Sequence, residues 1–100
     1  MLAACTGILF LSGCNSEAKK TYDQAAQDLE DGIYDDALTG YEASAKAEYK
    51  TAESFRGAGI AKLHLGNYQE AADYFTSALK EDKISKSLKK DILSYRATAQ

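Results

Sequence analysis

Apolar residues recur along this chain at intervals of three and four positions, which is the spacing of residues on one face of an α-helix. The pattern is interrupted at Gly32 and at Gly66, and polar stretches separate the remaining segments. It predicts helices at about residues 17–31, 34–47, 51–65, 68–80 and 87–100. We therefore expect an all-α fold in which short turns make consecutive helices antiparallel.

Each predicted helix has an apolar stripe that defines its expected inward face. The stripes are Ala18, Tyr22, Ala25, Ala26 and Leu29; Tyr34, Ala37, Leu38, Tyr41 and Ala45; Ala52, Phe55, Gly59, Ile60 and Leu63; Tyr68, Ala71, Ala72, Phe75, Ala78 and Leu79; and Leu88, Ile92, Tyr95 and Ala99. Ser16 is a candidate N-cap of the first helix, because its hydroxyl can accept an unbonded backbone N–H. Gly57 and Gly59 each cost about 1 kcal/mol of helix stability relative to Ala, so we expect another backbone to approach closely there.

Two segments of the chain repeat each other at a constant offset. The matched pairs, each separated by 34 positions, are Gly32 and Gly66, Tyr34 and Tyr68, Ala37 and Ala71, and Tyr41 and Phe75. A fixed period of this size indicates stacked helical repeats, in which each unit leaves one hydrophobic face to be covered by the next. The last predicted helix supplies that cover for Phe75 and Leu79.

These residues resemble the tetratricopeptide repeat. The second unit fills the family's pattern with Phe55, Ala58, Gly59, Gly66, Tyr68, Ala71, Phe75 and Ala78, and the first with Ala25, Gly32, Tyr34, Ala37, Tyr41 and Ser44. The resemblance implies a repeat domain over residues 18–100, with units at 18–49 and 52–83 and a partial third unit or capping helix at 87–100. It also implies that the helix pairs stack as a right-handed superhelix.

In this family the first helices of successive units line a concave groove for peptides. By resemblance, the candidate groove residues here are Tyr22, Arg56, Ile60, His64 and Arg96, with Lys19, Ala26, Leu29, Glu53, Leu63 and Gln100 on the same stripe. The planar guanidinium of an arginine suits a carboxylate or a backbone carbonyl. The alternative is that each of these is an ordinary exposed residue.

The N-terminal segment suggests a route to the membrane. Residues 2–11 are apolar but too few to cross a bilayer, which needs about 20 residues in a helix. They have the size of a signal-peptide core and end in Leu11-Ser12-Gly13-Cys14, which resembles the lipobox of bacterial lipoproteins. That resemblance implies a signal peptide at residues 1–13, a lipid on Cys14 and a short tether over residues 14–17. The alternative is an apolar tail with a chance Leu-Ser-Gly-Cys.

Charge is unevenly distributed. Residues 14–49 contain nine acidic and three basic side chains, whereas residues 50–100 contain six acidic and nine basic ones. This polarised distribution lacks the broad basic field of a nucleic-acid binder. A series of lysines at Lys80, Lys83, Lys86, Lys89 and Lys90 has three interpretations: a solvated loop, contact with an anionic partner or surface, or contact with the acidic first unit of another copy.

Catalytic and metal-binding patterns are missing from the sequence. His64 is the single histidine, and both cysteines lie within the first 14 residues. The acidic pairs at residues 30–31 and 35–36 flank a predicted turn, and the second pair falls in the first turn of a helix, where negative charge meets the positive end of the helix dipole. We therefore expect no enzymatic activity, no cofactor and no metal; an enzyme or its accessory domain is the hypothesis with least support.

The sequence thus favours a non-enzymatic scaffold, lipid-anchored on the extracytoplasmic side of a membrane in the bacterial cell envelope. Its expected partner is a protein or peptide of that envelope, with no nucleic acid. Two alternatives stay open: a self-associating structural repeat module, or the N-terminal fragment of a longer repeat lipoprotein.

Overall fold

The computed structural model describes residues 11–100, and the side chains from residue 16 onward. Most of the predicted signal peptide, residues 1–13, and the side chain of Cys14 lie outside this part of the chain.

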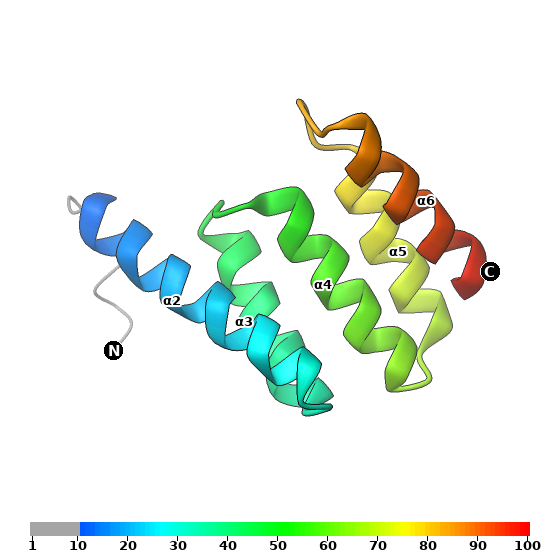
Figure 1. The fold of residues 1–100 in the computed structure, drawn as a ribbon, viewed down its shortest axis with the longest axis horizontal. Helices are drawn as coiled ribbons and strands as arrows, with labels where there is room; N and C mark the ends of the chain where they lie inside the picture. The colour runs from blue at the N-terminus through cyan, green and yellow to red at the C-terminus, as the bar shows by residue number, and fades with distance from the viewer. Residues whose placement is uncertain (1–10) are drawn as a thin grey trace.

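Helices make up almost all of the described residues. They are α2 (Leu11–Glu30), α3 (Tyr34–Lys46), α4 (Thr51–His64), α5 (Tyr68–Leu79) and α6 (Lys86–Ala99), drawn in Figure 1. No strand occurs within residues 11–100. The prediction of an all-α fold built from five helices is confirmed.

The two predicted glycine turns have the same backbone geometry. Gly32 has φ 80° and Gly66 has φ 85°, in the left-handed region that glycine occupies at little cost. After α2, Gly32 N–H donates to Leu29 O at 3.2 Å and Ile33 N–H donates to Asp28 O at 2.8 Å. This is the Schellman motif, and α4 ends in the same way at Gly66. Each turn therefore reverses the chain in about three residues.

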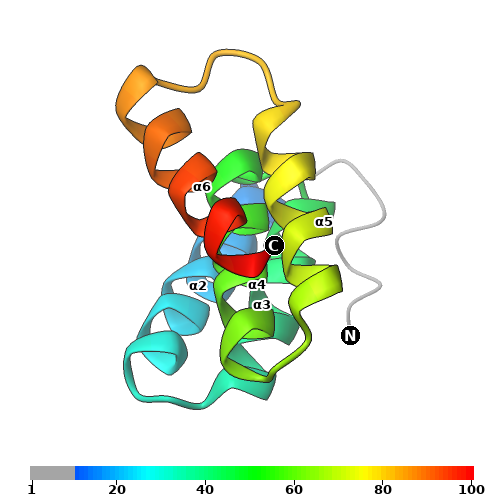
Figure 2. The same cartoon turned by 90° about the vertical axis from the view of Figure 1, so that its right-hand side faces the viewer.

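Helix α4 lies at the centre of the fold and contacts each of the other four helices. α2 and α6 lie on one side of the molecule and α5 on the other, as Figure 2 shows. The buried residues of α4 are small except for one isoleucine: Ala52, Ser54, Gly57, Ala58, Gly59, Ile60 and Ala61. Small side chains let the neighbouring helices approach α4 closely from several directions.

The two glycines within α4 make room for aromatic rings. A Cβ atom at Gly57 would lie 2.4 Å from the ring of Tyr41 on α3, and one at Gly59 would lie 2.5 Å from the ring of Phe75 on α5. The expected close approach therefore occurs, but the prediction that another backbone makes it is wrong. The approaching groups are the two ring residues that are related by the 34-residue repeat.

Two hydrophobic clusters fill the space between the helices. One surrounds Tyr41, and the other surrounds Phe75 and Ile92, both of which are 0% exposed. Ile92 comes from α6, and Tyr95 of the same helix stacks on Phe75 at 5.7 Å between ring centroids. The prediction that the last helix covers Phe75 is confirmed.

One polar contact is enclosed among these apolar groups. Ser44 on α3 and Ser54 on α4 are both 0% exposed, and their hydroxyl oxygens are 2.6 Å apart. Either hydroxyl can donate the bond between them, and the other can donate to a carbonyl: Tyr41 O is 3.1 Å from Ser44 Oγ, and Tyr49 O is 2.9 Å from Ser54 Oγ. Both buried hydroxyls are therefore satisfied within the protein.

Two details differ from the predictions. α2 begins at Leu11, so Ser16 lies inside the helix, where the N–H groups that it was expected to cap already have intrahelical partners. Tyr68, expected to point inward, is 57% exposed. Its counterpart Tyr34 stacks on His64, whereas no aromatic ring of the described residues stacks on Tyr68.

Candidate interaction face

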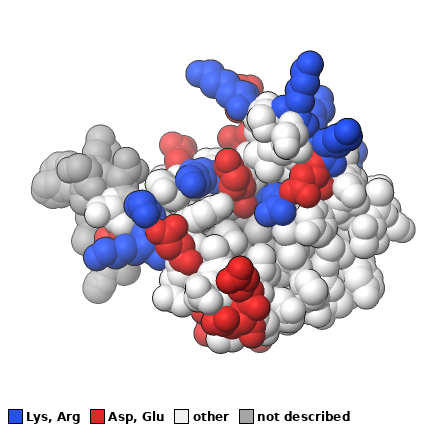
Figure 3. Space-filling model, viewed as in Figure 1, with Lys and Arg blue, Asp and Glu red and all other residues white. Residues whose placement is uncertain are grey.

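Helices α2, α4 and α6 form the face that is turned toward the viewer in Figure 3. We call this the inner face and define it by Tyr22, Glu53, Arg56, Asp91 and Tyr95. Charged side chains of both signs lie on this side of the molecule, beside a broad area of uncharged surface (Figure 3). The inner face therefore presents aromatic rings and charged groups that can form hydrogen bonds.

Arg56 is the central charged residue of the inner face. Its Nε donates to Asp91 Oδ2, which joins α4 to α6. The guanidinium also lies over the ring of Tyr95, with its carbon 5.3 Å from the ring centroid. The side chains of Arg56 and Asp91 are 30% and 41% exposed, so the pair is accessible to a third group.

Tyr22 occupies the α2 end of the inner face. Its ring meets those of Tyr41 and Tyr49 edge-on, at centroid distances of 5.5 Å and 5.7 Å. The ammonium of Lys50 lies 5.2 Å from the Tyr22 ring centroid, within the range of a cation–π contact. Burial raises the pKa of the Tyr22 phenol, and the nearby Glu53 carboxylate raises it further. The hydroxyl therefore stays protonated at neutral pH and can donate a hydrogen bond.

The other three candidates lie in different surroundings. Ile60 is 7% exposed and belongs to the hydrophobic cluster around Phe75. His64 stacks on Tyr34 at 4.3 Å, at the opposite end of α4 from Glu53. Arg96 Nη1 donates to Thr76 Oγ1 on α5 at 3.2 Å. Of the five candidates, Tyr22 and Arg56 are the two that the fold brings to the defined inner face.

Sequence reasoning missed Asp91 and Lys50. Asp91 is the single acidic residue of α6, a helix that otherwise contains Lys86, Lys89, Lys90 and Arg96. An isolated acidic residue in a basic helix could have indicated a tertiary ion pair, although not its partner. Lys50 lies in a loop with φ 44°, and nothing in the local sequence pattern predicts its position above a ring.

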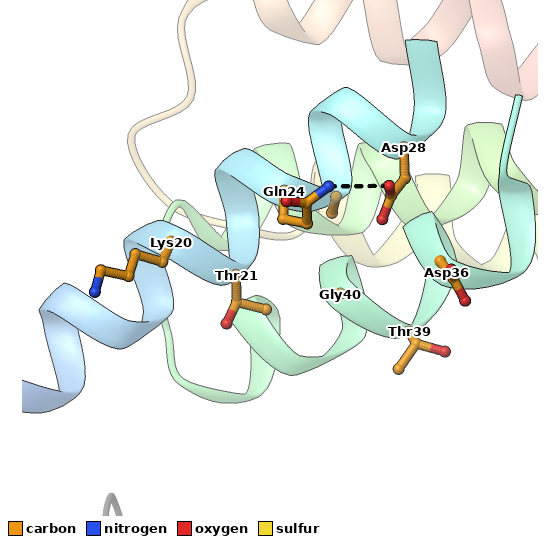
Figure 4. A pocket seen from close by; sticks show the side chains of 8 residues that line it. Lys20, Thr21, Gln24, Asp28, Asp36, Thr39 and Gly40 are labelled. Carbon is orange, nitrogen blue, oxygen red and sulfur yellow. Dashed lines mark hydrogen bonds between the residues drawn. The ribbon is translucent and has the colours of Figure 1, made fainter. Parts of the chain in front are cut away.

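A depression of about 510 Å³ lies between α2 and α3 and opens to solvent. Figure 4 shows the side chains that line it. It is lined by Lys20, Thr21, Gln24, Ala25, Asp28, Asp36, Thr39 and Gly40. Gly40 brings the two helices together, because a Cβ there would be 2.8 Å from Ala25 Cβ. Gln24 already donates to Asp28 Oδ1 at 3.1 Å, so this depression is the polar margin of a helix crossing.

The described residues contain no group of three or more His, Cys, Asp or Glu side chains that could hold a metal ion. None of the helices within residues 11–100 is long and apolar enough to cross a membrane.

No family model matches the chain, and comparison with curated proteins and with solved structures gives no significant match to either. The helical-repeat architecture therefore rests on the geometry described above.

Proposed function

We propose that this chain is a non-enzymatic, membrane-anchored tetratricopeptide-repeat lipoprotein that acts as a protein–protein interaction scaffold in the bacterial cell envelope. The observation that carries the proposal is the inner face, where the Tyr22 ring on α2 and the partly exposed Arg56 guanidinium on α4 lie on the first helices of the two stacked units. This combination suits a peptide with a carboxylate and apolar side chains.

The assignment to this repeat family is supported by residues 34 positions apart that have the same structural role in the two units. Gly32 and Gly66 end helices with the same hydrogen bonds. Tyr41 and Phe75 each fill space above a glycine of α4. Ala37 and Ala71, both 0% exposed, occupy the corresponding helix crossings. A period of 34 residues is the period of this family.

The lipid anchor is supported by Leu11-Ser12-Gly13-Cys14 at the start of α2. If Cys14 carries diacylglycerol, each buried CH₂ contributes about 0.8 kcal/mol to membrane binding, and more than one acyl chain holds the protein firmly. A fixed position at a membrane raises the effective concentration of the scaffold for neighbouring envelope proteins.

The anchor can be tested by metabolic labelling with a radioactive fatty acid. We expect the unaltered chain to incorporate label and to sediment with membranes, and Cys14→Ser to lose both properties. Cys5→Ser is the matched control, because it removes the other thiol and leaves the lipobox intact. Equal labelling of the Cys14→Ser chain would rule out the anchor.

The inner face can be tested with two variants that break the same ion pair. Arg56→Gln removes the guanidinium, whereas Asp91→Asn removes its intramolecular partner and leaves the guanidinium available. We expect crosslinking to envelope proteins in cells to fall with Arg56→Gln and to be kept or increased with Asp91→Asn. The loss of stability is shared by both variants, since an exposed pair contributes only about 0–1 kcal/mol. Equal crosslinking by the two variants would show that partners bind elsewhere.

A further inference from the structure

The up-and-down course of the helices divides the molecule into two edges (Figure 1). The start of α2, the α3–α4 loop at residues 47–50 and the α5–α6 segment at residues 80–90 lie along one edge, which we call the N-terminal edge. The turns at Gly32 and Gly66 lie along the other, which we call the turn edge. The residue that carries the proposed lipid, Cys14, is in the first turns of α2 and hence at the N-terminal edge.

Charge separates along the same division. When each helix is divided at its middle, the half toward the N-terminal edge (residues 11–20, 41–57 and 74–92) has ten basic and seven acidic residues, a net charge of +3. The half toward the turn edge (residues 21–40, 58–73 and 93–100) has two basic and eight acidic residues, a net charge of −6. Figure 3 shows basic side chains over the start of α2 and over α6, and an acidic group at the α2–α3 turn.

The strongest basic group lies in the α5–α6 segment. Lys80, Lys83, Lys86, Lys89 and Lys90 are all exposed, and none of them makes an ion pair with another described residue. Two acidic residues, Glu81 and Asp82, lie among them, so the segment keeps a net charge of +3. Within the described residues, these lysines therefore have no carboxylate partner for their charge.

The position of Cys14 leaves little distance between a lipid and the packed protein. Ala18 is 5% exposed and already belongs to the core, so three residues separate it from Cys14. A chain of this length reaches about 14 Å at most when fully extended and about 6 Å as a helix. Electrostatic attraction extends over about 8–10 Å at physiological salt. A lipid on Cys14 would therefore hold the N-terminal edge within reach of the headgroups.

We infer that the N-terminal edge lies against an anionic phospholipid surface, with the lysines of residues 80–90 as a second contact beside the lipidated Cys14. This rests on the proposed lipid anchor and adds an orientation to it. The turn edge, with net charge −6, faces away from the bilayer. The inner face then stands roughly perpendicular to the plane of the bilayer. Partners therefore reach Arg56 from the side rather than from the membrane. Each lysine near an anionic surface contributes about fivefold to affinity.

The opposite orientation would place the turn edge on the membrane. That edge has exposed apolar residues, Ile33 and Leu65, which are 46% and 42% exposed. However, it also has the acidic residues 30, 31, 35 and 36, which anionic headgroups repel. It also lies at the end of α2 farthest from Cys14. Charge and tether length thus favour the same orientation.

Depth-dependent quenching can measure this orientation in the lipidated full chain. A fluorophore is attached through Ser87→Cys at the N-terminal edge or through Gln69→Cys at the turn edge, in both cases with Cys5→Ser. Both positions are exposed and in the first turn of a helix. The protein is reconstituted on phosphatidylglycerol vesicles that contain a lipid with a nitroxide headgroup. We expect quenching at position 87 and much less at position 69.

Two charge variants provide matched controls. Lys83→Gln, Lys86→Gln and Lys90→Gln together change the net charge by −3 and should reduce the difference between the probes to what the tether alone produces. Glu30→Gln, Asp35→Asn and Asp36→Asn together change it by +3 at the turn edge and should leave the difference in place. Raising the salt to 1 M, where screening shortens to about 3 Å, should act like the lysine variant.

The outcomes separate this inference from the anchor itself. If Cys14 is not lipidated, its thiol takes up a second fluorophore, and the anchor fails. If Cys14 is blocked but both probes are quenched equally, or position 69 more strongly, the anchor stands and the orientation is wrong. The same difference on neutral phosphatidylcholine vesicles would show that the lysines are not its cause.

Discussion

At residue scale, the same helix ending is built at three places with different residues. Gly32 and Gly66 occupy the left-handed position after α2 and α4. After α3 that position is taken by Glu48, with φ 60°, whose N–H donates to Ala45 O while Tyr49 N–H donates to Ser44 O. A side chain in this conformation costs about 1–2 kcal/mol, which the surrounding hydrogen bonds must offset.

Replacing Glu48 with glycine should therefore stabilise the protein. Glu48→Gly removes the Cβ that opposes the left-handed conformation, and we expect a gain of about 1 kcal/mol, reduced by the greater freedom of glycine in the unfolded chain. In a domain of this size that raises Tm by about 4–8 °C. Glu48→Gln is the control, because it removes the charge and keeps the strain. Equal melting temperatures for both variants would contradict this explanation.

At the scale of the elements, α4 is shaped by the rings of its neighbours. Gly57 and Gly59 face opposite partners, Tyr41 on α3 and Phe75 on α5. Glycine weakens an isolated helix, but here it keeps two aromatic residues in contact with the α4 backbone. The helix therefore gives up intrinsic stability for closer packing of both units.

This balance predicts the effect of a single methyl group. Gly59→Ala should gain about 1 kcal/mol of helix propensity but lose about 1–3 kcal/mol because its Cβ would overlap the Phe75 ring, for a net destabilisation. Urea unfolding measures the difference. Phe75→Leu should destabilise the natural chain but be better tolerated together with Gly59→Ala, because the smaller side chain vacates the overlap. Additive effects of the two substitutions would show that they do not share this space.

At the scale of the whole molecule, α6 is the end of the stack. It contacts α5 and α4, and its buried residue Ile92 completes the cluster around Phe75. The next residue of the same helix, Leu93, is 40% exposed. Repeat proteins are stabilised by contacts between neighbouring units, so the docking of this helix determines whether the second unit is covered.

Two adjacent alanine substitutions can test the importance of that docking. Ile92→Ala should destabilise the protein by about 2–5 kcal/mol, because it removes buried methyl groups and leaves a cavity beside Phe75. Leu93→Ala should cost less than about 1 kcal/mol, since much of its side chain stays in water. Both variants have the same loss of size within one helix, and urea unfolding compares them. Similar losses would mean that α6 does not pack as described.

Most of the fold could be predicted from the repeated sequence pattern. The 34-residue offset located both glycine turns and paired Tyr41 with Phe75, because turn geometry and close packing restrict the residues at those positions. The apolar stripe of the last helix correctly placed Ile92 over Phe75. Such positions are predictable because few side chains satisfy them.

The candidate site was less predictable because its contacts depend on tertiary geometry. Arg56 and Arg96 both belong to helices that were expected to line the groove, yet one bonds Asp91 on α6 and the other bonds Thr76 on α5. Long side chains at a surface have several possible partners of similar free energy, and spacing alone does not choose among them.

The Ser44–Ser54 contact has a consequence for how the two units align. The seam between α3 and α4 is lined mostly by small side chains, apart from the Tyr41 ring that lies against Gly57. A shift of one helix along the other would separate the two serine hydroxyls, which lie 2.6 Å apart, and would also move the Tyr41 ring away from Gly57. Ser44 would still reach the carbonyl of Tyr41 in its own helix, so the polar loss is one buried hydrogen bond, worth about 0.5–1.5 kcal/mol. The serine pair and the ring therefore favour the same alignment of the two units.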